Sequence, residues 1–125
     1  MADTKLQTRD QRQANDAWAA VASYGDKNLK DLSTTCKKTC TRVLVSGLGP
    51  ALAFALTKTD DQHRVVRDAL GKHLGKGDPS ALLQALIGGT AEDLRRKTDD
   101  ALSFLTWMAR LADGKAKQAE GKAKP

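Results

Sequence analysis

Residues 91–112, AEDLRRKTDDALSFLTWMARLA, carry the longest regular hydrophobic pattern in the chain. Apolar or small side chains recur every three or four positions over about five turns or more: Leu94, Thr98, Ala101, Leu102, Leu105, Met108, Leu111 and Ala112. This spacing is typical of an amphipathic α-helix that buries one face. Phe104 and Trp107 widen the apolar surface, so we expect this helix to contact neighbours on two sides.

The preceding sequence predicts further helices with clear boundaries. The expected ranges are 9–24, 27–46, 50–57, 61–74 and 79–88. Gly25 and Gly47 follow two of these segments, as glycines that end helices do. Asp60 or Asp61 can cap the fourth helix, Asp78 precedes Pro79 as an N-cap, and Thr90 begins a capping-box variant. No strand pattern is visible.

Composition agrees with an all-α fold. The chain has 125 residues, of which 40% are hydrophobic, enough for one buried core. We predict a compact single-domain bundle of five to six helices over residues 9–112. Residues 1–8 are expected to be flexible, and the Lys/Ala/Gly-rich tail, residues 113–125, to be disordered because it has few apolar side chains.

Several classes of protein are excluded by the sequence. No run of about 18 apolar residues could span a membrane, and the polar N-terminus lacks a signal-peptide core. The chain has 2 cysteines, too few for a secreted disulfide framework. We therefore expect a cytoplasmic protein with no membrane partner.

The basic excess is concentrated in one predicted helix. The chain has 21 Lys and Arg against 15 Asp and Glu, a net charge of +6, which favours polyanionic partners. Residues 26–42 hold five basic and two acidic side chains, and the tail adds a smaller excess. The other predicted helices are close to neutral.

Motifs for catalysis or cofactor binding are missing. Cys36 and Cys40 share a helix face, but a metal site there would need ligands from the only histidines, His63 and His73, and small core side chains are the favoured interpretation. We interpret His63 as partly exposed surface and His73 as a residue that favours a helix C-terminus. Asp60-Asp61 suits a helix cap and Asp99-Asp100 a solvated face. We expect no enzyme activity, no cofactor and no metal.

Seven basic residues are candidates for contact with nucleic-acid phosphates: Lys37, Lys38, Arg42, Arg64, Arg67, Arg95 and Arg96. They are chosen for charge and predicted exposure, and each is equally well explained as ordinary solvated helix surface. The few aromatic side chains fall on predicted buried faces, so base stacking is not expected. Contact with nucleic acid should therefore involve the backbone and its shape.

Three segments, QRQANDAWAAV, GLGPALAFALTK and AEDLRRKTDDALSFLTWMARLADGKAK, resemble the small all-helical subunit of the type III-B CRISPR effector, the Cmr RAMP-module complex. The resemblance covers residues 11–112. Its most specific parts are the residues of GLG-x-ALAF and of ALSFLTWMARLA: Gly47, Leu48, Gly49, Ala51, Leu52, Ala53, Phe54, Ala101, Leu102, Phe104, Leu105, Trp107 and Leu111. The cysteines and threonines of the second helix and the long tail depart from the family pattern.

The resemblance implies a non-catalytic structural subunit in antiviral defence. Such subunits stack with backbone subunits and with further copies of themselves, and they present basic side chains to the phosphates of guide RNA and target RNA. The isolated chain is then expected to be a monomer. Because the matched motifs are packing motifs, they support the fold and the assembly but no particular RNA contact.

Two other functions remain open from the sequence. A basic helical DNA-binding protein would need a polar recognition helix, and ALAFALTK after the GLGP turn is too apolar for that role. A protein-only adaptor differs in predicting no salt-sensitive affinity for nucleic acid.

Overall fold

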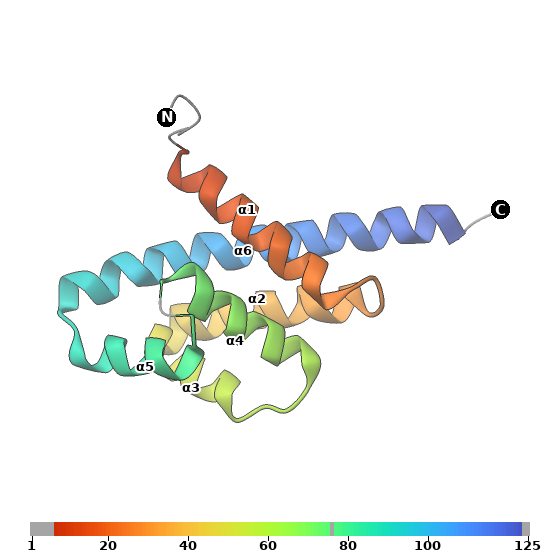
Figure 1. Cartoon of the computed structure of the whole chain (residues 1–125). Helices are drawn as coiled ribbons and strands as arrows, with labels where there is room; N and C mark the ends of the chain where they lie inside the picture. The colour runs from red at the N-terminus through yellow and green to blue at the C-terminus, as the bar shows by residue number, and fades with distance from the viewer. Residues whose placement is uncertain (1–6, 76, 124–125) are drawn as a thin grey trace.

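Six α-helices and no strand make up the part of the chain that the computed structural model describes, residues 7–75 and 77–123 (Figure 1). The helices are α1 (Arg9–Tyr24), α2 (Leu29–Ser46), α3 (Leu48–Leu56), α4 (Asp61–His73), α5 (Pro79–Gly88) and α6 (Ala91–Ala123). The predicted all-α bundle of five to six helices is confirmed.

Helix α6 is the element on which the bundle is built. In Figure 1 it runs the length of the molecule, and α1 crosses it steeply. The contact between α2 and α6 is more extensive than the contact between any other two of the described helices. Phe104, Leu105 and Met108 of α6 are completely buried, and each such side chain contributes about 1.5–3 kcal/mol when withdrawn from water. The core around them includes Ala17, Val21, Leu32, Cys36, Leu52, Val66, Leu70 and Leu82.

The expected caps set the helix boundaries. Asp60 accepts a hydrogen bond from the backbone N–H of His63, Asp78 caps α5 ahead of Pro79, and the Thr90 hydroxyl accepts the N–H of Asp93 at 3.0 Å. Gly47 joins α2 to α3 with φ +100°, a conformation that favours glycine. These local signals were read correctly from the sequence.

The C-terminal end of α6 corrects a prediction. We expected disorder after Ala112, but the helix continues to Ala123. Ala, Lys, Gln and Glu are strong helix formers, and adding turns to an existing helix avoids the cost of nucleation. Ala116 is also buried. The predictions for residues 1–6 and 124–125 lie outside the described residues, whereas Thr8 forms a capping box with Gln11 at the start of α1.

The buried stripes of α1 and α2 also differ in part from the expected ones. The helical spacing of apolar residues in the sequence predicts that Trp18 is buried with Ala17 and Val21, and Leu44 with Cys40 and Val43. In the structure, Trp18 is 52% exposed and Leu44 is 71% exposed. Gln13 is buried in line with Ala17 and Val21. A buried amide needs a partner, and Gln13 finds one on α6, so the face that α1 turns inward includes a polar residue that periodicity does not select.

That partner belongs to a polar junction of α1, α4 and α6. The Gln13 amide donates to Asp100 Oδ1 at 2.7 Å. His73 places Nδ1 2.6 Å from Asp16 Oδ2 and Nε2 2.8 Å from Asp100 Oδ1, and its ring stacks on Phe104 at 4.3 Å. The interpretation of Asp100 as solvated surface is therefore wrong, whereas His73 lies in the last turn of α4 as expected. Both ring nitrogens lie within hydrogen-bond distance of carboxylate oxygens, so His73 joins α4 to α1 and to α6.

Asp100→Asn should destabilise the bundle and reduce its sensitivity to acid. Burial raises the pKa of Asp100, but hydrogen bonds from Gln13 and His73 outweigh burial and leave the pKa below its ordinary value. Stability from this group is then present above the unfolded pKa and is lost as pH falls through the lower, folded pKa. We expect a loss of about 1–3 kcal/mol at neutral pH, measured by denaturant unfolding, and a flatter stability curve at acid pH. Asp99→Asn is the control; equal effects of the two variants would contradict the role of the junction.

Gly71→Ala tests the contact between α4 and α5. A Cβ atom at Gly71 would lie 2.9 Å from Pro79 N and 3.0 Å from Asp78 C, both backbone atoms. We expect a loss of about 1–3 kcal/mol in the free energy of unfolding because the two helices must separate. Gly88→Ala meets nothing within 4 Å and should leave stability unchanged or raise it slightly. Thermal unfolding that ranks these variants in the opposite order would contradict the close approach.

Candidate nucleic-acid interface

The outer face of α2 carries lysines and threonines. Lys30, Thr34, Lys37, Lys38 and Thr41 are exposed, while Leu29, Leu32, Cys36 and Val43 are buried on the opposite side. The 3.6-residue period thus separates the apolar core from the basic excess. The charge that the sequence places in this segment lies largely on one solvent-facing surface.

The candidate lysines of α2 have different surroundings. Lys37 Nζ lies 3.2 Å from Asp113 of α6, with 63% of its side chain exposed. Lys38 makes no ion pair with any residue that the structure describes, and it is exposed. Lys38 is therefore free to meet a phosphate, whereas Lys37 already has a carboxylate partner.

The other three candidates from α2 and α4 gather around the end of α3. The Arg42 guanidinium lies 3.9 Å over the Phe54 ring. Arg67 donates to the Ala55 and Lys58 carbonyl oxygens at 2.9 and 2.7 Å. The Ala55 oxygen also accepts the backbone N–H of Lys58. The two contacts therefore attach Arg67 to the C-terminal end of α3 and hold it in a structural position.

Arg64 is the more exposed arginine of α4. It pairs with Asp61 at 3.5 Å and lies 3.4 Å from the Thr59 carbonyl oxygen. Lys58 joins this cationic group, 4.9 Å over the Phe54 ring, and sequence reasoning missed it. A single lysine just after a short apolar helix offers little signal before the fold brings it close to Arg42 and Arg67.

The candidates on α6 lie apart from the lysines of α2. Arg95 and Arg96 are exposed in the first turns, and Arg96 is 3.9 Å from Glu92. Arg96 lies seventeen positions before Asp113, the partner of Lys37. This spacing corresponds to a distance of about 25 Å along the helix axis. The seven candidates therefore do not form one continuous patch.

Arg110 is a further cation that the sequence analysis missed. It lies on α6 between two hollows of about 350 and 420 Å³. The smaller hollow is lined by Asp10, Ser103 and Trp107. The larger one is lined by Lys37, Cys40 and Asp113. Arg96, Ser103, Arg110 and Lys117 follow each other at seven-residue spacing and so share one helix face; that spacing was the available signal.

Trp107 shows that not every aromatic side chain is buried. Its indole N–H donates to Asp10 at 3.0 Å, and part of the ring lines the hollow beside Arg110. Together with the exposed Trp18, it corrects the expectation that the aromatic residues fall on buried faces.

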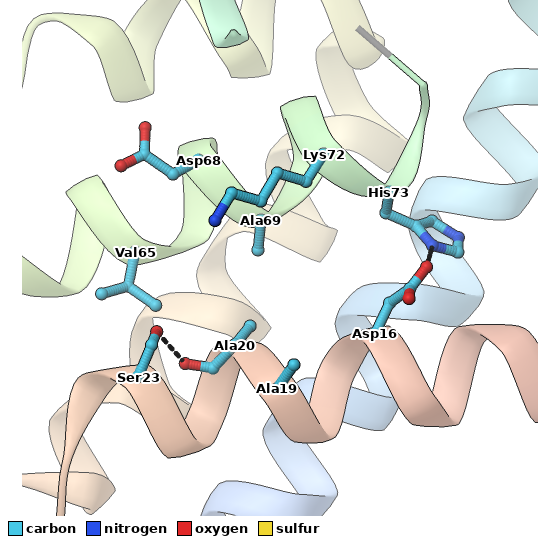
Figure 2. Close-up of a pocket in the computed structure, with 9 residues that line it drawn as sticks. All are labelled: Asp16, Ala19, Ala20, Ser23, Val65, Asp68, Ala69, Lys72 and His73. Carbon is cyan, nitrogen blue, oxygen red and sulfur yellow. Dashed lines mark hydrogen bonds and ion pairs between the residues drawn. The ribbon is translucent and has the colours of Figure 1, made fainter. Parts of the chain in front are cut away.

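A third hollow, of about 240 Å³, lies between α1 and α4 (Figure 2). Alanines and Val65 form much of its wall, and at one end the Asp16 carboxylate is held by His73 (Figure 2). His73 is thus committed to the polar junction that joins the helices, and the hollow presents no nucleophile beside a base.

The cysteines and the remaining histidine have structural surroundings. Cys36 is completely buried, and burial raises the pKa of its thiol to about 12; burial also raises the pKa of Cys40. Neutral thiols are poor metal ligands and nucleophiles. His63 hydrogen-bonds to Asp60 at the start of α4. Among residues 7–75 and 77–123, no three His, Cys, Asp or Glu side chains gather as a metal site.

Membrane insertion finds no support in the described helices, none of which is both long and apolar enough to cross a bilayer. The longest, α6, is amphipathic, with an apolar face on one side and charged residues on the other, as is typical of helices in globular proteins.

Comparison with known proteins identifies the family of this bundle. The model of the family described as CRISPR-associated protein (Cas_Cmr5) matches residues 9–115. The fold is similar to an X-ray crystal structure of a CRISPR-associated Cmr5 family protein from Thermus thermophilus, with a TM-score of 0.78 and 24% identity over 87% of this chain and 97% of that chain. No curated protein matches the chain.

The family model covers α1 to α5 and most of α6, including both hollows beside Arg110. The structural match extends over nearly the whole of the Thermus protein. The chain therefore belongs to the Cmr5 family of CRISPR-associated proteins, small subunits of the type III-B Cmr complex.

Proposed function

We propose that the protein is a non-catalytic structural subunit of a cytoplasmic type III-B RNA-guided effector complex in antiviral defence, and that it contacts guide-RNA or target-RNA phosphates through basic side chains. The observation that carries the RNA contact is the outward face of α2, where Lys30, Lys37 and Lys38 are exposed. Membership of the Cmr5 family supports the place in the complex.

The chemistry of this face suits a phosphate backbone. Lys30 and Lys37 are seven residues apart, two helical turns or about 10.5 Å, so they can meet different phosphates of one strand. Thr34 and Thr41, also exposed, add hydroxyl donors between them. Lysine and hydroxyl contacts to phosphate position a protein without reading base identity, which fits a subunit that must accept any guide sequence.

The candidate residues divide by how they are held. Lys37, Lys38, Arg64, Arg95 and Arg96 are exposed and can meet RNA directly. Arg42 and Arg67 are held by Phe54 and by the carbonyl groups of α3, so they act first as supports for the cationic group at the end of α3. With a net charge of only +6, strong binding requires several copies or subunits along one duplex.

Partner subunits would find apolar contact points on the surface. Leu44, Val45 and Ile87 are 71%, 80% and 77% exposed, and exposed large apolar side chains favour protein contacts when they gather. They support assembly with other Cmr subunits and further copies of the chain. The same observation is what a protein-only adaptor would show, so RNA binding has to be tested separately.

Lys37→Glu with Lys38→Glu should weaken capture of target RNA by the assembled complex. Loss of two phosphate contacts should lower affinity by about tenfold or more near physiological salt and reduce the slope of log affinity against log salt by about two. Filter binding across a salt series measures both quantities.

The matched control is Arg12→Glu with Lys72→Glu, the same charge change on α1 and α4 at exposed positions. If both double variants lose affinity equally, net charge explains the loss and the α2 face is not the contact. If the chain fails to enter a guide-RNA particle when co-expressed with the other subunits, its place in the complex is wrong.

A further inference from the structure

The last turns of α6, Asp113–Glu120, lie against α2 and the α1–α2 loop, and we call them the C-terminal segment. Asp113 is 3.2 Å from Lys37, and Glu120 is 2.7 Å from Lys30. On the other side, Lys115 pairs with Asp26 at 3.3 Å. Three ion pairs therefore join eight residues of helix to the most basic part of the chain.

The spacing of charges on the two helices is matched. Asp113 and Glu120 are the only acidic residues after Ala112, and they are seven residues apart, as are their partners Lys37 and Lys30. The partners appear in reverse order because the helices run antiparallel. Both acidic residues of the segment thus occupy lysines of the proposed RNA-contacting face.

Apolar packing contributes little to this attachment. Within the segment Ala116 is buried, whereas Lys117, Gln118 and Ala119 are exposed. One turn earlier, Met108, Ala109 and Ala112 are buried. Lys115 is half-buried and lies 5.8 Å over the Trp18 ring. The other two ion pairs are exposed, so salt screens them and they contribute modestly to stability.

The charges that form these pairs are present at neutral pH. The Lys30 ammonium lowers the pKa of Glu120, and Glu120 raises the pKa of Lys30. The Ser33 hydroxyl lowers the pKa of Asp113 most, and Lys37 lowers it further. The distance and angle from Ser33 Oγ to Asp113 fall outside those of a normal hydrogen bond. Changes of pH near neutrality therefore leave the pairs intact, whereas salt or a competing anion weakens them.

We propose that the C-terminal segment is an electrostatic strap that occupies Lys30 and Lys37 in the free subunit and is displaced by the phosphate backbone of RNA. This inference rests on the proposed function, because it regulates the same surface. An RNA strand presents phosphates in a row and gains from counterion release, so it competes with two isolated carboxylates for the two lysines. Once displaced, Asp113 and Glu120 are repelled by the bound strand. The strap thus weakens binding of nucleic acid by the subunit, both in isolation and within its complex.

Asp113→Asn with Glu120→Gln tests the strap, since both changes preserve shape and remove the competing charge. The assembled complex and the isolated full chain should each bind a single-stranded oligouridylate about tenfold more tightly than wild type, with a steeper dependence on salt. Asp68→Asn with Asp99→Asn is the control with the same change in net charge; neither residue forms an ion pair with any part of the chain that the structure describes.

Hydrogen exchange provides a measurement that needs no RNA. Raising salt from about 50 to about 500 mM should speed exchange of the backbone amides of residues 113–123, because the Debye length shortens several-fold, and should leave residues 101–112 unchanged. The Asp113→Asn, Glu120→Gln variant should exchange rapidly at both salt concentrations, and oligouridylate should accelerate exchange in wild type.

The outcomes separate the two proposals. If wild type and variants bind no RNA even in the assembled complex, the RNA-contact function fails and the strap's displacement with it. If RNA binds but the strap variant gains no more than the control, or if salt leaves exchange in residues 113–123 unchanged, the strap fails and the RNA-contact function stands.

Discussion

Helix α6 has an apolar surface too wide for one neighbour to cover, and the arrangement of the other helices follows from covering it. Phe104, Leu105 and Met108 are completely buried, with α2 along one side and α1 across another. Helices α3, α4 and α5 then close the core over α2 and α1. Withdrawing these side chains from water is the dominant favourable term in folding, and the remaining features are placed relative to it.

A polar junction within this apolar frame specifies how the helices meet. Hydrophobic burial has no direction, so it tolerates rotation of α1 about its axis. The contacts of Asp100 with Gln13 and His73, and of His73 with Asp16, do not, because removing one partner leaves a buried polar group unsatisfied. The stacking of His73 on Phe104 couples the junction to the core, so that polar and apolar contacts select the same packing.

The surface derives its properties from the same packing. Antiparallel alignment of α2 with α6 brings Lys30 and Lys37 to Glu120 and Asp113, and closure of α3 on α2 brings Arg42 over Phe54. Apart from the arginines of α6, the exposed positive charge of the candidate residues lies in two groups, one on the outer face of α2 and one around the end of α3. The proposed phosphate-binding face of this Cmr5-family chain therefore has fewer free cations than the composition indicates, because carboxylates of α6 pair with Lys30 and Lys37.

Local chemistry along the chain was sufficient to predict the helices, their caps and the basic face of α2, because the 3.6-residue period, Asp78-Pro79 and Gly47 act within a few residues of themselves. Pairings between residues far apart in the sequence could not be predicted: Gln13 with Asp100, Lys30 with Glu120, and Arg42 with Phe54. Composition also misjudged residues 113–123, since few apolar side chains do not prevent an established helix from continuing. Periodicity is a property of neighbouring residues, whereas partners of buried polar groups and of surface charges exist only after distant helices pack.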